Sequence, residues 1–278
     1  MRYLGNKNVL ATNIIDEIRK RVPVESKVLD CFGGTGCVAR ELCDHFEDVS
    51  SCDINHYAYV LCYCRTRVPK DMNIDDSISR LNALPHVHGL ITKLYSPEGG
   101  RKYFTTENAA KIDAMRKQIR DWDIDEDTRM LLLGNLIESV SKFSNIPGTY
   151  GAYNENWDPR ALKPFILEKL IDNTRAPMGE TYRCDAKCIV DGDYDVIYMD
   201  PPYNQRNYAT YYHVLETLSI YDESVEIKDN KTGTPIHVEP SAWCSKPKCI
   251  DELKEFMGKS KAKLIIMSYN NEGIIPDA

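Results

Sequence analysis

An acidic residue, two prolines and a tyrosine, Asp200-Pro201-Pro202-Tyr203, directly follow the apolar run 194–199. The exocyclic amine of adenine is a poor nucleophile because its lone pair is delocalised into the ring. The Asp200 carboxylate and the Pro201 carbonyl could accept hydrogen bonds from both N–H groups of such an amine, so that its nitrogen becomes more tetrahedral. The prolines restrict the backbone that carries these acceptors, and Tyr203 offers a flat face to an extruded base. The motif predicts activation of a base amine; the alternative is a Pro-Pro turn that only ends a strand.

A glycine-rich loop follows a second apolar run, 28–32. Glycines let the backbone approach a ligand, and the helix predicted after them offers free N–H groups. Asp53 ends the next apolar run, where a carboxylate can accept both hydroxyls of a ribose. The loop alone could serve packing, but with the acid it predicts a nucleoside-containing cofactor. The loop consists of Asp30, Cys31, Phe32, Gly33, Gly34, Thr35 and Gly36.

The elements that must position these residues alternate between helix and strand at both ends of the chain. This pattern predicts an α/β fold with a doubly wound, Rossmann-like sheet. Helical patterns dominate from about 55 to 180, and residues 223–249 form a long polar loop. The predicted strands are 28–32, 49–53, 194–200 and 262–268, and the predicted helices are 8–21, 37–46, 55–67, 107–122, 126–143 and 211–221.

The domain boundaries follow from this division. Residues 1–60 and 185–278 should form the sheet domain, and residues 61–184 a mainly helical insertion. The alternative is a continuous α/β fold whose middle strands carry a weak signal.

Composition excludes several classes of protein. With 278 residues, 42% hydrophobic and 28% charged, the chain can form a large core. No apolar stretch approaches a membrane span, and the N-terminus has no secretion signal, which predicts a cytoplasmic protein. Four of the ten cysteines could form a zinc site, but their loose spacing favours ordinary reduced thiols and no metal. These four are Cys184, Cys188, Cys244 and Cys249.

A net charge of −7 argues weakly against binding nucleic acid by charge alone. Residues 101–120 are nevertheless locally basic, and part of the segment is predicted to be helical. Such a basic run is commonly a helix face exposed to solvent. The alternative is that it contacts DNA. The candidate DNA-binding residues are Arg101, Lys102, Arg116, Lys117 and Arg120.

Together these motifs resemble the class I S-adenosylmethionine-dependent methyltransferases. More narrowly, they resemble the D12 group of N6-adenine-specific DNA methyltransferases, which includes Dam-like enzymes and type II modification enzymes. The matching motifs are 2–7, 30–36, Asp53 and the Asp-Pro-Pro-Tyr tetrad. Four further stretches, 103–105, 148–152, 211–216 and 268–273, resemble the branch that contains the FokI-type modification enzymes.

The resemblance implies a reaction and a set of roles. The cofactor would be S-adenosylmethionine, enclosed by Tyr3, Gly5 and Lys7, with Lys7 near its methionine end. Asp185 lies where the family often has an acid that contacts the adenine ring of the cofactor, although the residues around Asp185 fit the family pattern poorly. The substrate would be a flipped-out adenine in double-stranded DNA, and the insertion would recognise the target. A cognate restriction endonuclease is implied for a modification enzyme, but not for an orphan or phage enzyme. An RNA base-amine methyltransferase and a catalytically silent nucleic-acid-binding relative remain alternatives.

One departure concerns the end of the sheet. The sheet of the class normally ends in two further strands that form a hairpin, whereas the sequence stops at Ala278, shortly after the run 262–268. We therefore expect a missing C-terminal segment or a second chain to complete the sheet.

Overall fold

The computed structural model describes residues 7, 10–69, 71–171, 178–205, 207–238, 241–270 and 272–275. These residues form two compact units. The sheet unit contains the described residues up to 69 together with 178–208 and 241–275, and the helical unit contains 71–171 and 209–238.

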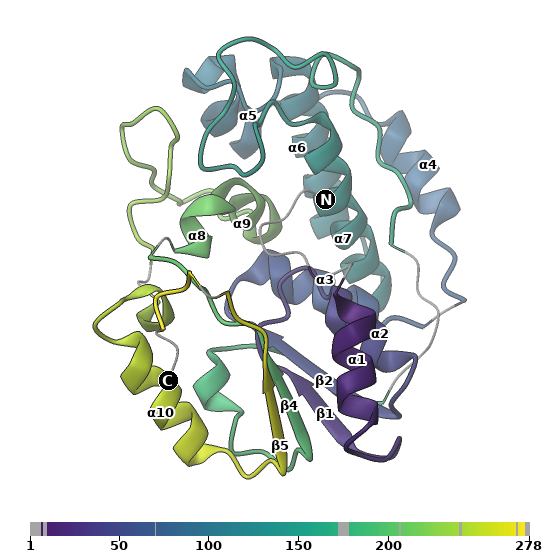
Figure 1. Ribbon diagram of the computed structural model, residues 1–278. Helices are drawn as coiled ribbons and strands as arrows, with labels where there is room; N and C mark the ends of the chain where they lie inside the picture. Colours follow the sequence, from purple (N-terminus) through teal and green to yellow (C-terminus); the bar gives the residue numbers. More distant parts are fainter. Residues whose placement is uncertain are drawn as a thin grey trace. The chain divides into compact units, whose positions relative to one another are not determined.

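The sheet unit is built on five parallel strands in the order β3-β2-β1-β4-β5 (Figure 1). This topology confirms the predicted α/β fold with a Rossmann-like sheet. The strands are β1 (Lys27–Asp30), β2 (Asp48–Asp53), β3 (Thr181–Arg183), β4 (Val196–Met199) and β5 (Leu264–Met267).

Helices cover both faces of this sheet, which explains the continuous apolar runs of its central strands. In β4, Val196 and Tyr198 belong to one hydrophobic core, and Ile197 and Met199 belong to the other. The first core is closed by α1 (Ala11–Arg19) and α2 (Cys37–Cys43), and the second receives Phe256 from α10 (Cys249–Lys259). Figure 1 shows α1 and α10 on opposite sides of the strands. Another helix, α3 (His56–Thr66), follows β2.

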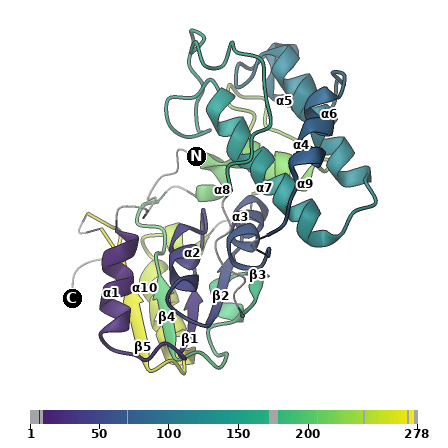
Figure 2. The same ribbon diagram turned by 90° about the vertical axis from the view of Figure 1, so that its right-hand side faces the viewer.

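The helical unit consists of several packed helices (Figure 2). The longest, α6 (Thr106–Asp121) and α7 (Glu126–Phe143), begin at capping residues: Thr105 accepts a hydrogen bond from the Asn108 amide, and Asp125 accepts one from the Thr128 amide. Helix α7 is buried along most of its length and packs on α6 and on α9. The shorter helices are α4 (Asp75–Ala83), α5 (Leu90–Tyr95), α8 (Tyr208–Tyr211) and α9 (His213–Ile220).

The structure differs from the predicted boundaries in two places. Residues 61–69 and 178–184 belong to the sheet unit, whereas 209–238, predicted to be part of the sheet domain, belong to the helical unit. Residues 178–184 differ because β3, whose three residues are half-buried or exposed at a sheet edge, lacks an apolar run. Residues 61–69 differ because α3 runs to Thr66 and packs on β2 and β3. Residues 209–238 differ because the chain leaves the sheet after the tetrad and supplies α9 to the helical unit.

Strand β5 is less buried than the sequence predicts. Its first three residues are half-buried and Met267 is 39% exposed. Within the described residues, β5 pairs with β4 and has no strand on its other edge.

None of the helices in the described part of the chain combines the length and apolar character needed to cross a membrane. All ten cysteines are free thiols. Across the described residues, no group of three or more histidine, cysteine, aspartate or glutamate side chains is arranged to hold a metal ion.

Candidate active site

Four acidic residues follow four neighbouring strands, in the order in which those strands lie in the sheet. Asp185 comes two residues after β3, and Asp53 ends β2. Asp30 ends β1, and Asp200 directly follows β4. Because the strands are parallel, all four residues lie along the same, carboxyl edge. The strand order reverses between β1 and β4, which is where open α/β sheets bind their ligands.

Asp200 forms an ion pair with Lys7. The Lys7 Nζ atom lies 2.6 Å from Asp200 Oδ2, and the two side chains are 14% and 20% exposed. Burial raises the pKa of Asp200, and the Lys7 ammonium opposes this shift by its charge and its hydrogen bond. Lys7 therefore favours the ionised carboxylate, the form that accepts hydrogen bonds. The resemblance placed Lys7 near the methionine end of a cofactor, and the structure places its ammonium on the candidate catalytic acid.

The rest of the tetrad lies in the chain that leaves β4. Pro201 is buried, whereas Pro202 and Tyr203 are half-buried. The Tyr203 carbonyl accepts a hydrogen bond from the Ile274 amide at 3.1 Å. This bond fixes the far end of the tetrad, while β4 fixes its beginning.

The glycine loop requires glycine at particular positions. Gly34 and Gly36 have φ values of 54° and 74°, in the left-handed region that favours glycine. A Cβ atom on Gly33 would lie 2.4 Å from the Cys62 sulfur. The Gly33 amide donates to the Cys52 carbonyl at 2.9 Å, so the loop remains attached to β2.

Asp53 organises this loop from the neighbouring strand. Its Oδ2 accepts a hydrogen bond from the Gly34 amide at 3.0 Å, and its Oδ1 accepts from the backbone and side-chain nitrogens of Asn55 at 2.8 and 3.0 Å. Burial nevertheless raises the pKa of Asp53. Each carboxylate oxygen has two lone pairs, so Oδ2 retains capacity to accept from a ribose hydroxyl, whereas Oδ1 already accepts two hydrogen bonds from Asn55.

Asp30 is a buried carboxylate without an ion pair among the described residues. Its residue is 1% exposed, and within the described chain neither side-chain oxygen has a hydrogen-bond partner of normal geometry. Burial and the charge of Asp200 raise its pKa to about 7, while the backbone amides of Phe32 and Ala39 act in the opposite direction. A buried acid of this kind is stabilised by a positively charged ligand. S-Adenosylmethionine, with a sulfonium and an ammonium group, fits this requirement.

The other predicted cofactor residues occupy varied positions. Phe32 packs edge-on against Trp243 with ring centroids 5.2 Å apart, and Thr35 is buried. Asp185 accepts a hydrogen bond from the Lys187 amide at 2.9 Å and caps the 3₁₀ turn Ala186–Cys188. Tyr3 and Gly5 lie outside the described residues.

Sequence reasoning missed two residues of this site, Asn55 and Trp243. Asn55 carried a recognisable signal, since an asparagine two residues after a strand-ending acid and just before a helix is a typical capping position. Trp243 lies in the polar loop 223–249, where no periodicity distinguishes it.

Comparison with known proteins assigns the family. The model of the D12 class of N6 adenine-specific DNA methyltransferases matches residues 3–239. The chain belongs to this family. The chain is 34% identical to the type II methyltransferase M.NlaIII of Neisseria lactamica over 288 residues. This alignment covers 99% of this chain and 85% of that protein.

Two further relatives show how far the similarity extends. The type II methyltransferase M.FokI of Planomicrobium okeanokoites is 34% identical over 99% of this chain but only 45% of its own length. M.CviAII of Paramecium bursaria Chlorella virus 1 is 29% identical over 98% of this chain and 84% of its own length. The chain therefore spans most of some relatives and less than half of others. The predicted class of enzyme, an adenine-specific DNA methyltransferase, is confirmed by the family.

The structure corrects part of the predicted DNA-binding face of this methyltransferase. Arg101 is buried, and its guanidinium donates to the carbonyls of Leu94, Gly99, Lys228 and Asn230. Arg116 is also buried and donates to the carbonyls of Leu218 and Ser219 at 2.9 Å. These guanidinium groups satisfy backbone carbonyls in the interior of the helical unit. They do not form an exposed basic face.

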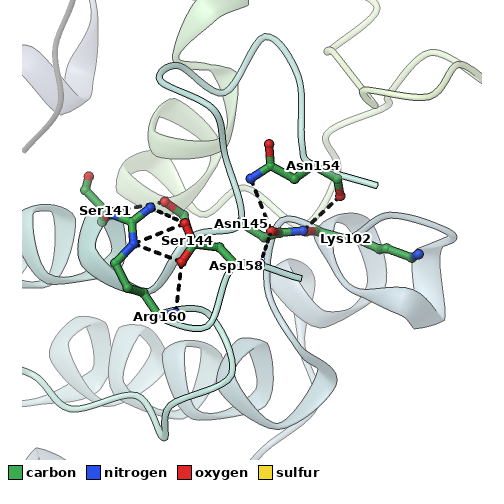
Figure 3. Close-up of polar contacts among 7 residues, drawn as sticks. All are labelled: Lys102, Ser141, Ser144, Asn145, Asn154, Asp158 and Arg160. Carbon is green, nitrogen blue, oxygen red and sulfur yellow. Dashed lines mark hydrogen bonds and ion pairs between the residues drawn. The ribbon is translucent and has the colours of Figure 1, made fainter. Parts of the chain in front are cut away.

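The other three candidates are more accessible. Arg120 is 46% exposed and pairs with the neighbouring Asp121 at 2.7 Å. Lys117 is half-buried, and the Lys102 ammonium lies 3.1 Å from the Glu155 carbonyl. Figure 3 shows Lys102 beside Asn145, whose side chain binds the Lys102 carbonyl.

Proposed function

We propose that this enzyme transfers a methyl group from S-adenosylmethionine to N6 of a flipped-out adenine in double-stranded DNA. The observation that carries the proposal is the order of the four acids along the sheet. The strands β3 to β4 span three inter-strand spacings, about 14 Å, which suits an extended nucleoside with an amino-acid tail. Asp185 would contact its adenine, Asp53 its ribose and Asp30 its methionine end, and the enclosing residues would include Tyr3, Gly5 and Lys7.

The orphaned carboxylate of Asp30 supports this choice of cofactor. The cofactor supplies an electrophilic methyl group on a positively charged sulfur. Asp30, Asp53 and Asp200 place negative charge around that position, and Lys7 is the cation paired with one of them. The residues present therefore fit a cationic ligand better than a neutral or anionic one.

Asp200 is the residue that acts on the adenine. Its carboxylate would accept a hydrogen bond from one N6 proton, and the Pro201 carbonyl would accept from the other. Transfer would form the N6–C bond as the methyl–sulfur bond breaks and leaves a neutral thioether, and N6 would then lose a proton, which Asp200 would accept. Burial raises the pKa of Asp200 and so strengthens it as a base. Tyr203 would stack on the flipped base.

The biological setting is proposed from the relatives. Several are named as type II methyltransferases or modification methylases of bacteria, and one comes from a virus. We infer a role in the cytoplasm of a prokaryotic or phage-infected cell, either beside a cognate restriction endonuclease or as an orphan or phage enzyme.

Transfer of labelled methyl groups to unmethylated duplex DNA and to RNA tests the proposal. We expect incorporation into DNA as N6-methyladenine, and its loss in Asp200→Ala. Incorporation into RNA alone would identify an RNA methyltransferase. No incorporation, with cofactor binding intact, would identify a silent nucleic-acid-binding relative.

A further inference from the structure

Three stretches that the reaction does not use meet at one place in the helical unit. Tyr103, Tyr150 and His213 come from the segments 103–105, 148–152 and 211–216, and all three are buried. The Tyr103 ring lies 6.1 Å from that of Tyr150 and 5.8 Å from that of His213, measured between centroids. Segments distant in sequence thus share one buried aromatic cluster.

The polar atoms of this cluster hold backbone carbonyls of two separate surface segments. The Tyr103 hydroxyl donates to the Tyr150 carbonyl at 2.8 Å and also lies 3.1 Å from the Thr232 carbonyl. His213 Nε2 lies 3.0 Å from the same Thr232 carbonyl, and its Nδ1 lies 2.9 Å from the Thr210 carbonyl. Burial lowers the pKa of His213, while the contacts of its two ring nitrogens with the Thr210 and Thr232 carbonyls act in the opposite direction.

The first surface segment is a short hairpin, residues 226–236. Ile227 and Pro235 form an antiparallel bridge, and the Lys228 amide donates to the Thr234 carbonyl at 2.8 Å. Arg101 holds it from inside, because its guanidinium binds the Lys228 and Asn230 carbonyls. Gly233 packs on Arg101 so closely that a Cβ atom would lie 2.4 Å from Arg101 Nε.

The second segment is the loop 146–153, which Asn145 closes at its base. The Asn145 side chain donates to the carbonyls of Lys102 and Asn154 at 3.0 Å each, and its oxygen accepts from the Asp158 amide at 2.9 Å (Figure 3). Gly148 lies in this loop without positive φ, and a Cβ atom there would meet nothing within 4 Å. Among the described residues nothing covers the loop backbone at Gly148, so another molecule can approach the backbone there.

In both segments the contacts from Tyr103, His213 and Arg101 are made to backbone carbonyls. Lys228 and Lys231 of the hairpin are exposed, and Lys231 pairs with Glu155. The acids proposed to hold the cofactor all belong to the other unit. A change in this cluster should therefore affect DNA without affecting the cofactor.

We propose that Tyr103 and His213 are positioning residues for DNA recognition, which hold the hairpin 226–236 and the loop 146–153 as one surface against the DNA duplex. The inference rests on the proposed function, because it takes duplex DNA as the substrate. Lys228 contacts a phosphate on this surface, and Gly148 allows the backbone of the loop to approach the DNA.

The first test compares Tyr103→Phe with Tyr95→Phe. Tyr95 is equally buried, bonds Thr217 Oγ1 at 2.9 Å and packs on Tyr103 and His213 with centroids 5.6 Å apart. Its hydroxyl contacts neither surface segment among the described residues. It therefore controls for loss of one buried hydroxyl within the same cluster.

We expect Tyr103→Phe to raise the KM for DNA roughly tenfold and to reduce discrimination between the recognition site and single-base variants of it, with kcat and the Kd for S-adenosylmethionine unchanged. The site is first mapped by sequencing modified bases in cells that express the wild type. Tyr95→Phe should stay within about twofold of wild type in all four quantities. Equal effects of the two variants would overturn the positioning role.

The second test measures phosphate contact. Lys228→Ala should reduce the slope of log affinity against log salt by about 0.9, the value of one phosphate contact in duplex DNA. Lys169→Ala, at an exposed lysine of the same unit that pairs with Asp75, should leave the slope unchanged. An unchanged slope in Lys228→Ala would contradict DNA contact by the hairpin. A wild type that methylates no DNA would instead refute the proposed function itself.

Discussion

The ammonium of Lys7 lies 2.6 Å from the carboxylate of Asp200, across 193 positions of sequence. The chain thus pairs the proposed catalytic acid with a cation before any base is present. Adenine must share or replace this contact, and the ion pair sets the protonation of the acid until then.

Replacing Lys7 by methionine should move the acidic limb of the pH–rate profile to higher pH. Lys7 lowers the pKa of Asp200, so its removal lets burial raise that pKa further, and the active carboxylate then needs a higher pH to form. Single-turnover rates between pH 5 and 9 measure the shift. Lys20→Met, at an exposed lysine that directly follows α1 and pairs with Glu17, is the matched control. A profile that falls in height without moving along the pH axis would contradict the effect on Asp200.

Binding of S-adenosylmethionine should release a proton from Asp30. The pKa of Asp30 is about 7 in the free protein, and a bound cation favours its ionised form. About half a proton per ligand should be released at pH 7, nearly one at pH 6 and almost none at pH 8.5. Calorimetry in buffers of different ionisation enthalpy measures this number. In Asp30→Asn the measured binding enthalpy should no longer depend on the buffer. If it still depends on the buffer in that variant, the released proton comes from another group.

The same residue predicts how the stability of the free protein depends on pH. The folded-state pKa of Asp30 lies above its unfolded value, about 3.9. The folded state therefore binds more protons between about pH 4 and 7, and this residue's contribution to stability falls as pH rises through that window. Asp30→Asn should flatten that part of the curve of melting temperature against pH. A curve identical to wild type would show that Asp30 does not titrate there.

Asp53→Asn should weaken binding of S-adenosylmethionine by about 1.5–3 kcal/mol, the range for hydrogen bonds to a charged group. The variant keeps one acceptor oxygen for Gly34 or Asn55 but loses the charge proposed to bind the ribose. Titration calorimetry gives the affinity. Asp193→Asn, at an exposed acid paired with Lys27, controls for the loss of charge in the same unit. Equal affinities for Asp53→Asn and wild type would remove Asp53 from the cofactor site.

Arg116→Met should destabilise the protein by about 2–4 kcal/mol without changing the salt dependence of DNA binding. The guanidinium satisfies carbonyls at the end of α9 and lies over the Tyr221 ring, so its loss leaves buried acceptors without a donor. Urea denaturation measures the first effect and filter binding the second. Lys117→Met, one residue along α6, should have little effect on stability. A flatter salt slope in Arg116→Met would restore this arginine to the DNA-binding face.

The sequence was informative wherever a local pattern decided the structure. The acids Asp30, Asp53 and Asp200 were recognisable because each follows an apolar run, and parallel strands bring such residues to one edge. The pairing of Lys7 with Asp200 left no such trace, since the two residues lie 193 positions apart in the sequence. Strand β3 was not predicted, because its three residues lie at an edge of the sheet and do not show the alternation of apolar and polar residues that would indicate a strand.

The burial of Arg116 could have been inferred. It lies four residues after Ile112 and three before Ile119, on the face of α6 that was predicted to point inward. The prediction of an exposed basic run relied on the positive charge of Arg116 and not on its position in the apolar repeat of the helix. Arg101 offered no comparable clue, because its partners at Lys228 and Asn230 lie more than 120 positions along the chain.

The helical unit is assembled from two stretches of chain that flank the tetrad, 71–171 and 209–238. Asp113 accepts a hydrogen bond from the Tyr221 hydroxyl, and Arg116 binds carbonyls of α9, so each stretch completes buried polar groups of the other. A chimaera that borrows only the first stretch from a relative would inherit donors and acceptors without their counterparts. If the helical unit recognises the DNA as proposed, we expect its sequence preference to pass between members of this family only when both stretches are exchanged together.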